Sequence, residues 1–277
     1  MNFCRCSFKV FSIWIIILAL TLLTGACDSD DILSPNIFTV QDDVQLGRDL
    51  DVQIKSNSSE YPLLNQASAN QYVQNMVNEI IKSPEIEYAD IFEYKTQIVL
   101  NDEVVNAFAA PGGFLYVYTG LLKFLDNEAT LAAVLAHEVA HAERRHATKR
   151  MTKQYGVSFL LGLILGDDPS QLEEIGANLL TGFALLKNSR DDEFEADEYS
   201  FKYLQSTKWY PGGITFFFQK IDDNSGSNFL EELLSTHPMP EDRVAAVEKM
   251  IEDANIPEPN ESNLFTTEYQ AFLKTLP

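Results

Sequence analysis

The stretch that decides the fold is LAAVLAHEVAH, residues 131–141. Its first part is almost wholly apolar, and the pattern is that of a helix. Asp126 or Asn127 can cap this helix at its N-terminus, and the helical run continues toward Lys153. The sequence therefore predicts a long helix whose middle is buried.

Three residues of that stretch have the arrangement of a catalytic metal site. His137 and His141 are four residues apart, so a helix places both rings on one face, separated by about 6 Å along its axis. Neutral histidine nitrogens bind zinc, and catalytic zinc sites keep one position for water. Glu138 lies beside that position and can move a proton from the water to a leaving amine. The alternative is an accidental cluster on a solvated face, but the apolar residues before it argue against this.

A third ligand is expected, and there are several candidates. An uninterrupted helix turns His146 about 180° away from the metal, so we interpret it as structural or as a support for the ligands. The segment SRDDEFEAD, residues 189–197, places Glu193 and Asp197 four apart on a second helix. One carboxylate can then bind metal while the other orients a histidine from behind. Glu195 competes with Glu193, and a solvated acidic helix start is the alternative to both.

The remainder of the chain reads as one domain over residues 39–277. Residues 93–100 and 104–118 are rich in β-branched and aromatic residues, and Pro-Gly-Gly at 111–113 predicts a tight turn between short strands. An apolar run at 157–165 is about half the length of a membrane span, so we expect it to pack in the core. Helical patterns cover residues 72–81, 171–187, 191–206, 213–221 and 240–253. The sequence thus predicts a mostly helical α+β domain with a small β-sheet beside the active-site helix.

Residues 1–26 have the layout of a secretory signal, with a positive start and a short apolar run. The run ends in LTGAC, residues 23–27, which resembles a bacterial lipobox except that Thr24 takes the usual place of leucine. This pattern predicts lipid attachment at Cys27 and a polar tether over residues 27–38. The alternatives are an ordinary signal peptide with an incidental cysteine, or an uncleaved anchor. A lipid anchor predicts a protein of the bacterial cell envelope, on the periplasmic or outer-membrane side.

The charge of the chain excludes one class of partner. It has 41 acidic against 20 basic residues, a formal net charge of -21. Binding to nucleic acid requires a basic surface that neutralises phosphates, so we expect no nucleic-acid partner. The oligomeric state is not encoded in any feature that we recognise.

Four blocks, in order along the chain, resemble the HtpX/BepA-like zinc metallopeptidases, which are gluzincins related to the CAAX prenyl proteases. The first is a strand and turn, the second is the histidine helix, the third is the acidic segment, and the fourth is a C-terminal signature. They are Asn106–Ala109 with Pro111–Gly113, His137–His146, Ser189–Asp197, and Thr236–Pro238 with Arg243. The resemblance runs from about Thr39 to Ala254.

The resemblance implies a gluzincin-like domain that holds one Zn²⁺ per chain through His137, His141 and Glu193. It implies that Asp197 and Arg243 support these ligands from behind. It also places His237 near the metal, where it either stabilises the tetrahedral oxyanion or caps the zinc in a latent state.

Asn106, Ala107, Phe108 and Ala109 lie in a stretch that we expect to form an edge strand. An edge can take an extended peptide by strand addition, which reads the peptide backbone and suits unfolded or misassembled proteins as substrates. The alternative is a strand paired on both sides. The predicted function is thus a zinc metalloendopeptidase of the cell envelope. The alternatives are a latent or non-catalytic zinc-bound chaperone or binding lipoprotein, and a lipid-anchored scaffold with an accidental motif.

Overall fold

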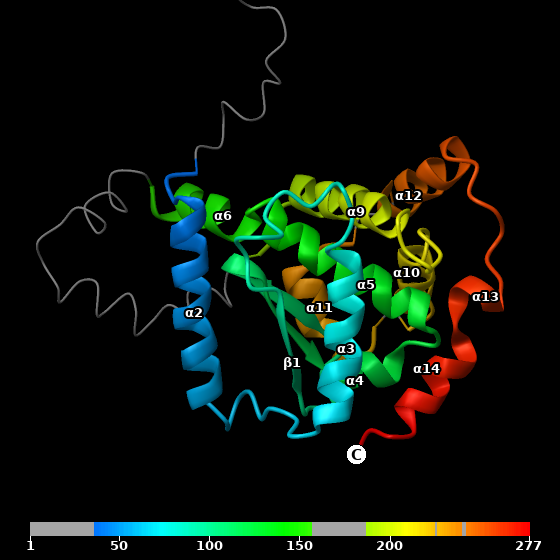
Figure 1. The fold of residues 1–277 in the computed structure, drawn as a ribbon, viewed down its shortest axis with the longest axis horizontal. Helices are drawn as coiled ribbons and strands as arrows, with labels where there is room; N and C mark the ends of the chain where they lie inside the picture. The colour runs from blue at the N-terminus through cyan, green and yellow to red at the C-terminus, as the bar shows by residue number, and fades with distance from the viewer. Residues whose placement is uncertain (1–35, 157–186, 225, 240–241) are drawn as a thin grey trace, which may run out of the picture. The chain divides into compact units, whose positions relative to one another are not determined.

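The computed structural model describes residues 36–156, 187–224, 226–239 and 242–277. The predicted signal sequence, Cys27, most of the tether, the apolar run at 157–165 and nearly all of the helical pattern at 171–187 lie outside the described residues. The part described is mostly helical with one small sheet (Figure 1), as the sequence predicts. None of its helices is both long and apolar enough to cross a membrane.

The sheet has three strands in the order β1-β3-β2. Strand β1 (Lys95–Val99) is parallel to β3 (Phe114–Tyr118), and β2 (Ala107–Ala110) is antiparallel to β3. The turn η1 (Pro111–Gly113) joins β2 to β3. Gly112 in this turn has a φ of 70° and lies so close to the backbone of Val44 that a side chain has no room. The predicted turn is therefore confirmed, and β2 lies at one edge of the described sheet.

Helix α5 (Glu128–Glu143) occupies the centre of the domain, and all of its residues are buried. Asn127 caps it, because its side chain accepts a hydrogen bond from the Thr130 amide. The helix contacts β2 and the helices α3 (Ala67–Ile80), α9 (Arg190–Leu204) and α10 (Ile214–Asp223), which surround it in Figure 1. A buried helix in contact with the sheet matches the predicted arrangement.

The prediction that α5 continues toward Lys153 is wrong. The helix ends at Glu143, Arg145 has a left-handed backbone with φ 58° and ψ 34°, and a separate helix α6 (His146–Tyr155) follows. Arg145 is held in this conformation by Asp43, which accepts a hydrogen bond from its Nε at 2.5 Å. Asp43 belongs to α2 (Val40–Ser56), so a contact from about 100 residues earlier in the chain ends the helix.

The remaining elements complete the shell around α5. Residues 36–38, which the sequence places in the tether, pack against the domain, since Asn36 donates a hydrogen bond to Thr148 and Phe38 is buried. Several short helices were not predicted from the sequence. These short elements are α4 (Thr119–Phe124), η2 (Asn228–Leu230), α11 (Glu231–Thr236), α13 (Glu261–Leu264) and α14 (Thr266–Leu273). The longer helix α12 (Asp242–Asp253) lies between α11 and α13 in the chain.

Candidate metal centre

Four side chains from three parts of the chain meet at the middle of α5. His137 and His141 come from α5, Glu193 comes from α9, and His237 directly follows α11. All four are buried, and one potential ligand atom from each lies within 4.8 Å of the others. The structure thus brings together the residues that the motif and the resemblance single out.

The spacing of three of these side chains suits a metal ion. Nε2 of His137 lies 3.0 Å from Nε2 of His141. Glu193 places Oε1 3.3 Å from Nε2 of His141 and Oε2 3.5 Å from Nε2 of His137. Two atoms that each bind a tetrahedral zinc ion at 2.0–2.1 Å are separated by about 3.3 Å. His137, His141 and Glu193 therefore fit a zinc-sized ion as they stand.

Glu193 reaches the site because α9 begins next to it and packs along α5. Ser189 caps α9 in a capping box with Asp192. About two turns beyond Glu193, Ser200 donates a hydrogen bond to the Ala133 carbonyl of α5 at 3.0 Å, which fixes the two helices side by side. The two interpretations of the acidic segment, a solvated helix start and a source of a metal ligand, therefore apply to different residues. Asp192 is part of the helix cap, whereas Glu193 is fully buried and faces the histidines.

His137 and Glu193 are braced from behind by a buried ion-pair network. Nδ1 of His137 lies 2.9 Å from Asp197. Arg243 donates two hydrogen bonds to the Asp197 carboxylate, at 2.7 and 2.8 Å, and its Nη1 lies 2.8 Å from Oε2 of Glu193. A carboxylate behind a histidine fixes the orientation of its ring and raises its basicity. Asp197 and Arg243 thus form one buried network with His137 and Glu193.

His141 is braced on its other side by His146. Their Nδ1 atoms lie 2.7 Å apart, and Nε2 of His146 lies 2.9 Å from Glu195. Arg144 completes the chain by donating from Nε to Glu195 at 2.7 Å. His146 therefore lies behind His141 and outside the four-residue cluster, but the physical reason is the break after α5 rather than rotation along a continuous helix. Glu195, the competing candidate ligand, faces His146 instead of the cluster.

Glu138 lies next to the cluster and is buried. Burial raises the pKa of its carboxyl above the ordinary value, although the neighbouring His237 and His137 oppose this in part. Nε2 of His237 lies 3.6 Å from Oε1 of Glu138. A carboxyl group with a raised pKa beside a metal site can both accept a proton and return it.

Asn188 was missed by the sequence reasoning. Its Nδ2 donates to Glu193 at 2.6 Å and lies 3.1 Å from Nδ1 of His237 and 3.3 Å from Nε2 of His141. The only signal for it is its place next to the acidic segment, since an asparagine carries no chemistry that marks a metal site. Its amide is a hydrogen-bond donor among the candidate ligands.

The charges of the cluster favour a divalent cation. Burial raises the pKa of Glu193, but His237, His137 and His141 outweigh it and hold that pKa well below its usual range. Burial and the neighbouring His137 hold the pKa of His141 well below its ordinary value. Burial also acts to lower the pKa of His137, but Asp197 and Glu193 raise it to about 10. A buried site that keeps Glu193 ionised and attracts a proton to His137 also attracts a metal cation, which would take the place of that proton. Its carboxylate and imidazole donors are of the type that zinc prefers.

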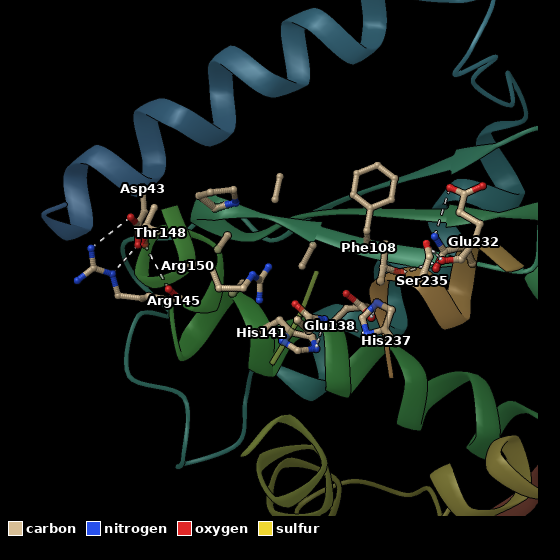
Figure 2. A pocket seen from close by; sticks show the side chains of 18 of the residues that line it. Asp43, Phe108, Glu138, His141, Arg145, Thr148, Arg150, Glu232, Ser235 and His237 are labelled. Carbon is tan, nitrogen blue, oxygen red and sulfur yellow. Dashed lines mark hydrogen bonds and ion pairs between the residues drawn. The ribbon is translucent and has the colours of Figure 1, made fainter. Parts of the chain in front are cut away.

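A cleft of about 120 Å³ opens onto Glu138, His141 and His237. Figure 2 shows it between strand β2, which carries Phe108, and the helices that carry the cluster. The Tyr118 amide donates a hydrogen bond to the Asn106 carbonyl. Because hydrogen-bonded residues alternate along an antiparallel strand, the backbone N–H and C=O groups of Ala107 and Ala109 point away from β3, toward the outer edge of β2. Asn106, Phe108 and Ala109 line the cleft, whereas Ala107 lines a smaller adjoining cavity. The four residues expected to bind substrate thus lie along one side of the candidate site.

Comparison with known proteins agrees with this geometry. The chain is 27% identical over 219 residues to the beta-barrel assembly-enhancing protease of Escherichia coli (strain K12), covering 75% of this chain and 43% of that protein. It is 26% identical over 241 residues to the putative beta-barrel assembly-enhancing protease of Vibrio cholerae, covering 82% and 49%. It is 32% identical over 161 residues to the mitochondrial metalloendopeptidase OMA1 of Arabidopsis thaliana, covering 58% and 32%. The chain therefore spans about half the length, or less, of these relatives.

The family model of peptidase family M48 matches residues 67–251. This range contains the histidine helix, the acidic segment and the C-terminal signature. It confirms the resemblance to the HtpX/BepA-like metallopeptidases that those blocks predict. The chain belongs to peptidase family M48.

Proposed function

We propose that the protein is a zinc-dependent endopeptidase that hydrolyses unfolded or misassembled proteins of the bacterial cell envelope. The observation that carries the proposal is the convergence of His137, His141 and Glu193 at zinc-compatible distances, with Glu138 beside them. An inert structural zinc site needs no such carboxylate. Membership of peptidase family M48 supports the same reaction.

In this proposal, His137, His141 and Glu193 would hold a zinc ion, which would supply Lewis-acid chemistry for the peptide carbonyl and the attacking water. Glu138 accepts a proton from the attacking water and delivers it to the leaving amine. Its raised pKa suits this double role, because a carboxylate that is too acidic holds the proton poorly. Asp197 and Arg243 keep His137 and Glu193 oriented while the proton moves.

His237 has two candidate roles, and the contacts support each in part. Its position 3.6 Å from Glu138 suits a donor to the developing oxyanion. Its place among the four converging side chains suits a fourth ligand that holds the enzyme latent. Replacement of His237 by Gln separates the roles: loss of oxyanion stabilisation lowers kcat by about 100-fold or more, whereas release of a latch raises activity.

The edge of β2 supports a substrate that binds as an added strand. Ala109 and Glu138 line the same cleft, so the outward edge of the strand lies beside the proposed base. A peptide paired there through its backbone would present successive carbonyl groups to the metal site. Such recognition depends little on side chains and suits unfolded segments of many proteins.

The cellular location follows from the sequence alone. The lipobox-like residues 23–27 support lipid attachment at Cys27, and therefore a membrane-anchored lipoprotein on the periplasmic or outer-membrane side. The curated relatives include beta-barrel assembly-enhancing proteases of bacteria, which is consistent with this location. Labelling with a radioactive fatty acid tests it, because wild type should incorporate label and Cys27→Ala should not.

The decisive test of the activity compares wild type with Glu138→Gln on denatured casein, with zinc content measured in both. Wild type should cleave, and Glu138→Gln should lose cleavage while it retains zinc. Equal cleavage by the two proteins would refute the role of Glu138. Zinc without cleavage in either protein, with His237→Gln also inactive, would instead support the alternative of a non-catalytic zinc-bound binding protein, which the fourth side chain of the cluster favours.

A further inference from the structure

Arg150 is a largely buried cation in the candidate active-site cleft, with a side chain that is 15% exposed. It lies on α6 and lines the same cavity as Glu138 and His141, and Figure 2 shows its side chain directed into that cavity beside them. Its Nε and Nη1 atoms are buried, and neither has a hydrogen-bond partner among the described residues. Burying guanidinium donors that make no hydrogen bond is costly, so this position is one that a ligand would improve.

The Asp192 carboxylate forms an ion pair with Arg150 but no hydrogen bond. Oδ2 of Asp192 lies 3.6 Å from Nη1 of Arg150, which is beyond hydrogen-bond distance. The same oxygen accepts the Ser189 amide at 2.9 Å as part of the cap of α9. The ion pair with Asp192 thus leaves the Nε and Nη1 donors of Arg150 without a hydrogen bond.

Arg145, a second arginine of the same cavity, has a structural role. Arg145 also lines the cleft, but it donates to Asp43 at 2.5 and 3.2 Å and to the Phe38 carbonyl at 2.5 Å. Its donors are used to hold the turn between α5 and α6. The contrast separates Arg145, whose hydrogen-bonded donors shape the cleft, from Arg150, which faces the cleft with an ion pair to Asp192 but no hydrogen bond at Nε or Nη1.

We propose that Arg150 binds a carboxylate of the substrate next to the scissile bond, an inference that rests on the proposed peptidase function. The planar guanidinium matches a carboxylate with two parallel hydrogen bonds. The far end of the cleft carries the opposite charge, because Glu232 lines it beyond His237 (Figure 2). A peptide with its carboxylate on the α6 side would therefore also be oriented along β2.

The carboxylate has two possible sources in a peptide. An aspartate or glutamate side chain near the cut site presents it in an internal segment, and the C-terminus presents it when the cut falls close to the end of the chain. Both would meet the same guanidinium. Peptides with an amidated C-terminus distinguish the two.

The experiment begins with the cleavage sites of denatured casein, mapped by mass spectrometry for wild type. Acidic residues, or chain ends, should be enriched at one fixed distance from the cut. Peptides are then made around one site with Glu or Gln at that position, each with an amidated or a free C-terminus. For wild type, kcat/KM should favour the carboxylate-bearing member of one pair by at least about tenfold, the usual effect of a hydrogen bond to a charged group.

Arg150→Gln should bring that ratio close to one. Lys153→Gln is the matched control, since it removes one positive charge from an exposed position on the same helix and should keep the ratio. A Glu-over-Gln preference assigns the side-chain source, and an acid-over-amide preference assigns the C-terminus. Absence of any carboxylate preference in wild type, or its full persistence in Arg150→Gln, would overturn the proposal.

A binding measurement keeps the inference separate from the proposed activity. The zinc-loaded Glu138→Gln protein is titrated with fluorescent versions of the four peptides. If no cleavage site is found, four casein-derived peptides are used instead, with Glu or Gln at one position and an amidated or free C-terminus. Tighter binding of the carboxylate peptide that is lost on adding Arg150→Gln supports the inference even without turnover. Equal binding of all four peptides contradicts it, whatever the outcome of the cleavage assay.

Discussion

The two candidate histidine ligands of α5 rest on supports of different kinds. Behind His137, Asp197 and Arg243 are buried, with Arg243 only 2% exposed. Behind His141, the chain runs through His146 to Glu195 and Arg144, whose side chains are 32% and 24% exposed. One support is sealed in the protein interior and the other ends at the surface.

This difference sets what each support contributes. Charges in the interior cannot be compensated by water, so a partner removed from the His137 side leaves another charge buried and unpaired. Water can replace a partner on the His141 side, because that network reaches the solvent. The Arg243 side should therefore govern folding as well as metal binding, and the Glu195 side should only adjust the site.

The largest effect is expected from Arg243→Met. The substitution leaves the carboxylates of Asp197 and Glu193 without their shared cation, which costs about 3–5 kcal/mol for a broken buried pair. Urea denaturation of the metal-free protein measures it. Lys249→Met on the same helix, where the lysine pairs with Asp253 at the surface, is the control and should change stability by less than about 1 kcal/mol. A loss below about 1 kcal/mol in Arg243→Met would show that the buried network is dispensable.

Asp197→Asn should act mainly on the metal. The carboxylate behind His137 is lost but the side chain keeps its shape, and changes of this type reduce metal affinity by about 10–100-fold. Competition with a chromophoric zinc chelator measures the affinity. Unchanged affinity would mean that the 2.9 Å contact of His137 with Asp197 does not orient the ring.

Glu195→Gln, the corresponding change on the other side, should reduce zinc affinity by less than about tenfold, the lower end of the range for such supports. Its effect on stability should also depend on pH. Hydrogen bonds with His146 and Arg144 outweigh burial and lower the pKa of Glu195 to about 2. The stability that the ionised carboxylate adds is therefore complete above its unfolded pKa, near 4.5, and disappears as the pH falls through about 2. Denaturation of both proteins across this range would contradict the account if their difference did not shrink at low pH.

Arg144→Gln should have the smallest effect. Arg144 pairs with Glu195 and with Glu87, which is largely exposed, and pairs of this kind contribute about 0–1 kcal/mol. The same denaturation assay checks it. A cost as large as that of Arg243→Met would remove the distinction between the two supports.

The sequence was sufficient for the parts of the site that depend on local spacing. His137, Glu138 and His141 share one helix, and their common face follows from helical geometry alone. The α+β class and the turn at Pro111–Gly113 also follow from local patterns. Glu193 was separable from Glu195 only through the resemblance, because helical spacing gives both a place on α9.

What the sequence could not reveal depends on contacts between distant residues. No glycine or proline marks the break after α5, since Arg145 is held in its left-handed conformation by Asp43 of α2. That break determines where His146 lies. Asn188 reaches the cluster because the chain before α9 lies beside the end of α11. There the backbone amide of Asn188 donates a hydrogen bond to the Thr236 carbonyl. Arg243 joins Asp197 to Glu193 from a helix about 50 residues further along the chain.

Zinc content in two matched variants of α9 tests the central claim most directly. Glu193→Gln and Glu195→Gln each neutralise one carboxylate, two residues apart on the same helix. Elemental analysis after dialysis against a slight excess of zinc should find one zinc ion per chain in wild type and in Glu195→Gln, and a small fraction of one in Glu193→Gln. Full zinc occupancy in Glu193→Gln would contradict a metal centre built from His137, His141 and Glu193.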